Sequence, residues 1–168
     1  HTIGILLGQD KEMEIAKQMY DVCTLLDEAK DFSHVRETYV AVAKSEASYR
    51  GLPFDINSFL MDTYNAAACI ASRGRPIPED FPLLVKGIRD VKNHVFGERY
   101  NAEIAAIRAV KVMFAAKCLM LNHAYADVLD LDVVQSEDLS PELRPMKYIR
   151  SQDKTAWAML VTICRMTA

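Results

Sequence analysis

Apolar residues along this chain recur every three or four positions, which is the period of an amphipathic helix, and they seldom alternate as they do in a strand. Glycine and proline interrupt this pattern at residues 51–53, 74–82, 97 and 141–145, which divides the chain into separate helical segments. The sequence therefore predicts an all-α fold, a single bundle of six to seven helices.

The limits of the expected helices come from residues that favour helix ends. Asp10, Ser33 and Asp55 each precede an apolar stripe, and their short polar side chains suit the N-cap position. Gly51 is suited to end the second segment. We expect helices at about residues 11–30, 34–49, 56–70, 79–96, 101–129 and 151–166.

The longest expected helix, residues 101–129, is apolar nearly all round in its second half. A helix of that kind has to be enclosed by others, so we expect this fifth helix to be the central, largely buried element of the bundle. It is not expected to span a membrane. Its uncharged run from Cys118 to Ala126 has only nine residues, whereas a spanning helix needs about 20.

The chain starts with an apolar stretch, "TIGILLG" from Thr2 to Gly8, that is too short for a signal sequence or a membrane span. We interpret residues 1–9 as an arm that packs on the domain or on a partner. Residues 10–168 are expected to form one helical domain. The content of 51% hydrophobic and 26% charged residues is ordinary for such a domain.

The formal net charge of −3 argues against a dedicated, non-specific nucleic-acid binder, which is usually basic. The charge is unevenly distributed, however. Residues 1–37 hold eight acids against four bases, and residues 142–168 hold five bases against two acids. The two ends can attract each other, within one molecule or between neighbouring copies. The simpler interpretation is a pair of differently solvated faces.

The four cysteines lie singly among apolar neighbours in expected helices, and no C-x-x-C motif is present. Free buried thiols in a reducing compartment explain this pattern best, with two disulfides as the alternative. No N-x-S/T glycosylation site is present either. We therefore expect a cytoplasmic or otherwise intracellular protein.

The common catalytic and nucleotide-binding motifs are absent. The chain contains no G-x-G-x-x-G, P-loop, G-x-S-x-G or H-E-x-x-H sequence, and no glutamate is followed three residues later by histidine. Our first hypothesis is therefore a non-enzymatic module for protein interaction and assembly, binding itself or another protein, with no cofactor.

One cluster supports an alternative hypothesis, a metal-dependent helical enzyme. His123, Asp127 and Asp130 would lie on one side of the fifth helix, at positions i, i+4 and i+7. An imidazole and carboxylates at this spacing can bind a divalent metal, or can form a general base with its orienting acid. The competing interpretation of His123 is a histidine hydrogen-bonded at the edge of the core, or one at an interface.

A second set of similar residues, Asp90, His94 and Glu98, lies close to the expected turn at Gly97. Along a helix that rises 1.5 Å per residue, His123 would be on the order of 35 Å from that turn. The two sets are therefore not expected to share a metal. An Asp–His pair four residues apart is also an ordinary contact on a helix surface.

Basic residues in two segments form the candidate binding site for a phosphate or a carboxylate. Tyr148, among them, could stack on a base, which makes nucleic-acid binding the second alternative function. A helix-turn-helix motif is disfavoured because the helix that would read the DNA, residues 55–72, has no basic side chain. The candidate binding residues are Arg73, Arg75, Arg144, Lys147, Arg150 and Lys154.

Overall fold

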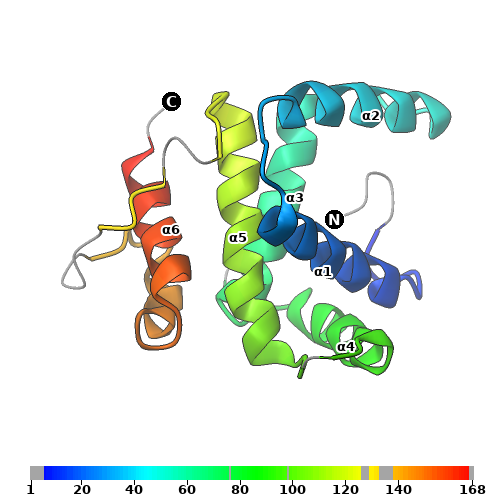
Figure 1. The fold of residues 1–168 in the computed structure, drawn as a ribbon. Coiled ribbons are helices and arrows are strands. Elements are labelled where there is room, and N and C mark those ends of the chain that lie inside the picture. Colours follow the sequence, from blue (N-terminus) through cyan, green and yellow to red (C-terminus); the bar gives the residue numbers. More distant parts are fainter. Residues whose placement is uncertain (1–5, 76, 98, 126–128, 133–137, 167–168) are drawn as a thin grey trace.

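Helices are the regular secondary structure of the described part of the chain, which confirms the predicted all-α fold (Figure 1). The computed structural model describes residues 6–75, 77–97, 99–125, 129–132 and 138–166. No helix among them is long and apolar enough to cross a membrane. The α-helices are α1 (Glu12–Glu28), α2 (Val35–Tyr49), α3 (Ile56–Ala71), α4 (Phe81–Val91), α5 (Ala102–Leu121) and α6 (Lys154–Arg165), and the 3-10 helices are η1 (Lys92–His94) and η2 (Arg144–Ser151).

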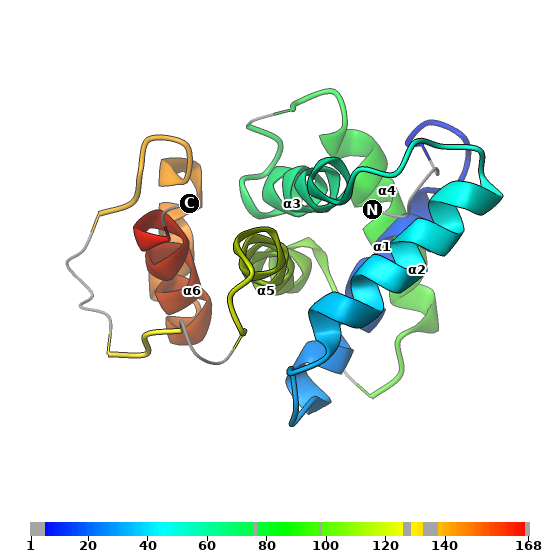
Figure 2. The ribbon, with the colours of Figure 1, turned by 90° about the horizontal axis from the view of Figure 1, so that it is seen from above.

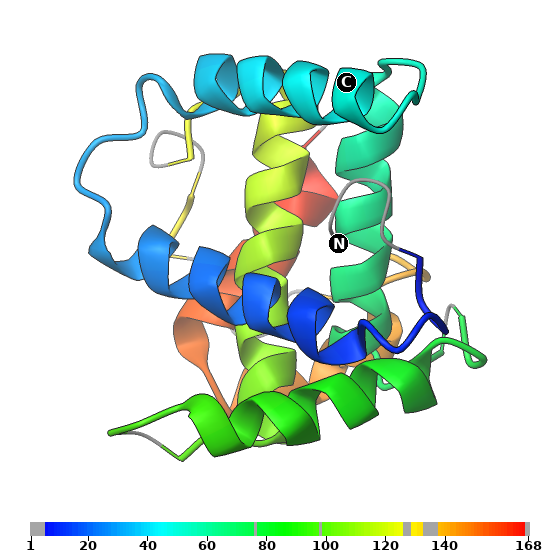
Figure 3. The same ribbon diagram turned by 90° about the vertical axis from the view of Figure 1, so that its right-hand side faces the viewer.

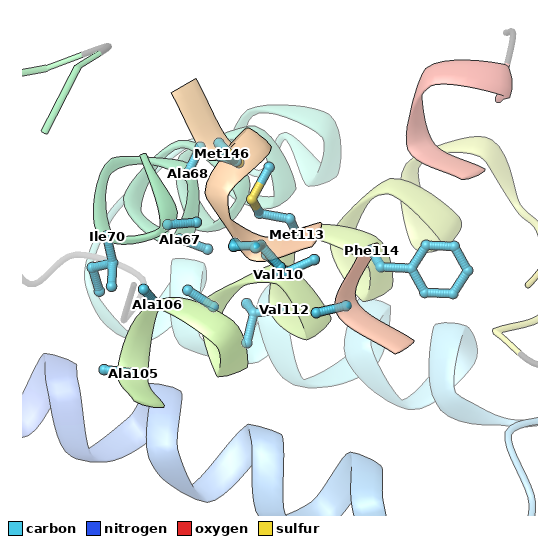
Figure 4. Packing of buried hydrophobic residues seen from close by; sticks show 14 of the residues in the cluster. Ala67, Ala68, Ile70, Ala105, Ala106, Val110, Val112, Met113, Phe114 and Met146 are labelled. Carbon is cyan, nitrogen blue, oxygen red and sulfur yellow. The ribbon is translucent and has the colours of Figure 1, made fainter. Parts of the chain in front are cut away.

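Helix α5 is the centre of the bundle, as predicted. It packs against α3 on one side, against α6 on another and against α1 and α4 on a third (Figures 1 and 2). Small side chains such as Ala67 in α3 and Ala106 in α5 let the helices approach closely, while Val110 and Met113 fill the space beside them (Figure 4). Figure 3 shows that α1, α2 and α4 all cross one face of the α3–α5 pair.

The end of α5 corrects the prediction that this helix continues to residue 129. The helix ends at Leu121, because Asn122 adopts the left-handed conformation with φ 58° and ψ 37°. The Asn122 and His123 N–H groups donate to the carbonyl oxygens of Leu119 and Cys118, at 3.4 and 2.9 Å. This pattern is a Schellman motif, and asparagine is one of the few residues besides glycine that enters it at low cost.

The predicted helix ends are confirmed in part. Asp55 caps α3, since its carboxylate accepts hydrogen bonds from the Asn57 and Ser58 N–H groups, and Gly51 ends α2 with φ 66°. Asp10 and Ser33 are wrong as N-caps, because neither α1 nor α2 has a side-chain cap. The fourth and last helices are shorter than expected, because α4 turns into η1 after Val91 and α6 begins only at Lys154.

The buried Glu12 at the start of α1 joins this helix to the preceding loop and to α4. Its carboxylate accepts from the Gly8 N–H at 3.1 Å and from the Lys86 ammonium of α4 at 3.1 Å. The hydrogen bond from Lys86 lowers the pKa of Glu12. Beside it, the missing side chain of Gly87 lets α4 approach the backbone of α1 directly. These contacts hold α1 and α4 together as a pair.

Candidate functional site

His123 lies at the rim of an apolar pocket of about 200 Å3, where the end of α1, the start of α2 and the end of α5 meet. The Phe32 and Tyr125 rings stack there with their centroids 4.8 Å apart. Arg36 closes one side, because its Nε donates to the Leu119 carbonyl at 3.2 Å. His123 itself is exposed, so the pocket is an apolar cleft with a histidine at its edge.

The helical arrangement that suggested a metal site is not present. Because α5 ends at Leu121, His123 does not share a helix face with Asp130, and Asp127 lies outside the described residues. Asp130 accepts a hydrogen bond from Arg165 at 2.8 Å instead. The part of the chain that the structure describes contains no group of three or more His, Cys, Asp and Glu side chains placed to hold a metal.

The second set of acids and histidine is not assembled either. Asp90 is in α4, whereas His94 is an exposed residue of η1. Glu98 lies outside the described residues. The expected surface contact between Asp90 and His94 stays a prediction.

The cysteines are free thiols and are not placed to act as nucleophiles. Burial raises the pKa of Cys23 to about 12, of Cys69 to about 11 and of Cys118 to about 12. A thiol with such a pKa stays protonated at neutral pH and reacts slowly. The partly buried Cys164 accepts a weak hydrogen bond from the Ser140 N–H at 3.4 Å.

The basic residues of η2 form a single row. A 3-10 helix has three residues per turn, so side chains three positions apart lie one above the other. Leu143, Met146 and Ile149 accordingly make one buried stripe. The next stripe, Arg144, Lys147 and Arg150, faces outward and is called the basic row below; its first two members are exposed and Arg150 is partly buried.

The structure adds Arg73 to the basic row from the far end of α3. Its guanidinium carbon is 4.1 Å from the centre of the Tyr148 ring, and the Tyr148 hydroxyl donates to the Ala71 carbonyl at 2.8 Å. The Arg73 guanidinium therefore covers one face of the ring on which a base was expected to stack. Arg75 and Lys154 are exposed. Among the interactions of the described residues, neither contacts an aromatic ring of η2 as Arg73 does.

Part of the charge in the basic row is already balanced within the chain. Lys147 pairs with Asp138 at 3.2 Å, and this hydrogen bond lowers the pKa of Asp138. The Arg150 guanidinium lies 5.8 Å from the centre of the buried Trp157 ring. Arg144 is exposed, and its charge also helps to lower the pKa of Asp138.

Helix α2 exposes an apolar surface that the sequence pattern did not reveal. Of its fifteen residues, only Ala43 and Ala47 are buried. Val35, Val42 and Tyr49 recur every seven residues and are 39%, 56% and 85% exposed. These three residues are called the α2 stripe below. Two residues of the stripe, Val35 and Val42, also line an open groove of about 440 Å3, together with polar residues and Tyr39.

The apolar exposure continues beyond α2. Leu52 and Phe54 in the following turn are also exposed, and Phe54 contacts Phe59 edge-on at 6.1 Å. Most of the large apolar side chains that the described structure leaves exposed lie between Val22 and Met61. The surface made by α1, α2 and the start of α3 is therefore distinctly more apolar than the rest.

Comparison of the chain with protein-family models, with curated proteins and with solved structures finds no match.

Proposed function

We propose that this chain is a non-enzymatic, intracellular protein-interaction module that assembles with itself or with another protein. The observation that supports it is the α2 stripe, which consists of three large apolar side chains spaced two turns apart on a helix that buries only two alanines. Exposed apolar surface with polar neighbours is typical of protein-binding sites. Covering it recovers roughly 25 cal/mol for each Å2 of apolar area removed from water.

Two further observations agree with this proposal. The free thiols suit a reducing, intracellular compartment. Leu7 packs against the core while Leu6 is 61% exposed, as expected if residues 1–9 are an arm beside one helical domain of residues 10–168 and the arm offers part of its apolar surface to a partner.

The test is the molar mass of the purified protein, measured by light scattering over a range of concentrations. The wild-type chain is expected to self-associate, and the double variant Val42→Asp, Tyr49→Ser is expected to associate more weakly. Phe96→Asp is the matched control, because Phe96 is 89% exposed but lies in the loop after η1. A wild-type chain that stays monomeric at every concentration, or an oligomer that the double variant leaves intact, would contradict self-assembly through α2.

A second candidate function, binding of a nucleic acid, is supported by the basic row and by Arg73 beside it. Phosphate contacts of this kind weaken steeply as salt is added. Retention on immobilised single-stranded DNA at low salt, lost in Arg144→Gln, would support it. Elution of both proteins with the void volume at low salt would remove it.

A further inference from the structure

We propose that the basic row of one copy docks on the outer face of α1 in a second copy, which gives a head-to-tail contact. This inference rests on the proposed function, because it adds a second contact between copies to the self-association through α2. The contact is heterologous, since it joins two different surfaces of the same chain, and repeating it produces an open chain or a closed ring.

The two surfaces lie on opposite sides of the molecule. Figures 1 and 2 show η2 and α6 on one side of α5, and α1 with α2 on the other. A single molecule therefore cannot bring its own basic row to its own α1. A second copy can do so without a change in the arrangement of the helices in either fold.

The accepting surface is an acidic and apolar face of α1. Asp21, Val22, Leu25 and Glu28 follow one another at helical spacing, and Val22 and Leu25 are 41% and 67% exposed. We call these four residues the α1 outer face. Helix α1 as a whole contains five acids and only one base, Lys17. Asp21 pairs with Lys17, but both side chains are about half exposed, and such pairs exchange partners at little cost.

The lengths of the two surfaces match. Arg144 and Arg150 are six residues apart in a 3-10 helix, which corresponds to about 12 Å at a rise of about 2 Å per residue. Asp21 and Glu28 are seven residues apart in an α-helix, which corresponds to about 10.5 Å. Both arginines can therefore meet a carboxylate at once, while Leu25 lies between the two pairs and is covered.

A second copy fits the basic row better than a nucleic acid does. The chain has a net charge of −3, which opposes the dense negative charge of a phosphate polymer more strongly than the small charge of a second copy. Arg73 covers the ring face of Tyr148 that a base would use, and Asp138 partly balances Lys147. What remains is a short row with two arginines, Arg144 exposed and Arg150 partly buried, which suits a pair of carboxylates.

The decisive experiment uses two neutralised variants of the full chain. The row variant is Arg144→Gln, Arg150→Gln, and the α1 variant is Asp21→Asn, Glu28→Gln. By sedimentation velocity at about 0.05 M NaCl, each variant alone is expected to associate at least about tenfold more weakly than the wild-type chain. Mixed in equal amounts, they are expected to recover association, because the intact row of the α1 variant can bind the intact α1 outer face of the row variant.

Salt and charge exchange give two further readouts. Wild-type association is expected to be largely lost at about 0.5 M NaCl, where the screening length is only a few Å. A chain with Arg144→Glu, Arg150→Glu, Asp21→Lys and Glu28→Lys together is expected to associate again. The matched control is Arg89→Gln, Lys92→Gln, which removes two exposed bases from the α4 and η1 segment and is expected to change nothing.

The outcomes separate this inference from the proposed function. Oligomers that persist in both neutralised variants, yet dissociate in the α2 double variant, overturn the row contact and leave the proposed self-assembly standing. A monomeric wild-type chain at all salt concentrations overturns both. A row variant that loses DNA binding with an unchanged oligomer assigns the row to a nucleic acid and overturns the inference. Arg150 lies near the buried Trp157, so the first row variant can lose stability. If its Tm falls, a second row variant, Arg144→Gln, Lys147→Gln, replaces it in the same measurements.

Discussion

Gly87 marks the closest approach of α4 to α1, and replacing it with alanine tests whether this approach holds the two helices in place. A Cβ atom at position 87 would lie 2.1 Å from the Glu12 carbonyl oxygen and 2.6 Å from its carbon. It would also lie 3.1 Å from the Ala16 Cβ. The Glu12 carbonyl belongs to backbone near the start of α1 and cannot rotate away, so the helices have to separate by about an ångström.

Two effects of opposite sign decide the magnitude. In an open helix position, glycine to alanine stabilises a protein by about 1 kcal/mol. Forcing extra atoms into a packed contact costs about 1–3 kcal/mol, and separating α1 from α4 also loosens the buried hydrogen bonds of Glu12. We expect Gly87→Ala to lower the free energy of unfolding by about 2 kcal/mol, which is a fall in Tm of about 4–8 °C for a chain of this size.

Urea unfolding followed by circular dichroism measures the effect, with equal m-values required for the comparison. Ala41→Gly in the exposed face of α2 is the control, because it measures helix propensity in this protein without a packing contact. If Gly87→Ala is as stable as the wild-type chain or more stable, the gain in helix propensity equals or exceeds the cost of the packing contact. The close α1–α4 contact is then not a constraint on the fold.

Three further predictions concern single contacts, each measured by thermal unfolding. Lys86→Met is expected to lower Tm near neutral pH, because it leaves the buried Glu12 carboxylate without its cation. The pKa of Glu12 is lowered in the folded state, so the stabilisation is present above its unfolded pKa and is lost as the pH falls through the folded value. The difference between Lys86→Met and the wild-type chain should therefore shrink as the pH falls below the ordinary pKa of a glutamate side chain; a constant difference would contradict the pairing. Asn122→Val is expected to cost about 1–2 kcal/mol, because a branched residue resists the left-handed conformation, while Asn122→Gly should be close to neutral; equal losses would rule out the Schellman end of α5. Tyr148→Phe is expected to cost about 1 kcal/mol by removing the hydrogen bond to α3; no loss would mean that this bond is exchanged for water without penalty.

The candidate site residues could be predicted only in part. The basic row has a local signal, because the apolar residues Leu143, Met146 and Ile149 repeat every three positions. This spacing is the period of a 3-10 helix, and it places Arg144, Lys147 and Arg150 on one face. The contact of Arg73 with Tyr148 has no local signal, because the two residues are 75 positions apart. The metal hypothesis required α5 to continue past His123. The helix ends at Leu121 instead, because Asn122 adopts the left-handed conformation.

The sequence by itself determined the helices, because each forms through hydrogen bonds between residues four positions apart and shows its period in the side chains. It determined the cap at Asp55 and the stop at Gly51 because these are local features, and it indicated the enclosure of α5 because that helix is apolar nearly all round. Only the tertiary structure decided which apolar faces are covered. The α2 stripe has the same helical period as a core stripe, yet it stays exposed because no other described helix packs over it, and that depends on how distant segments meet.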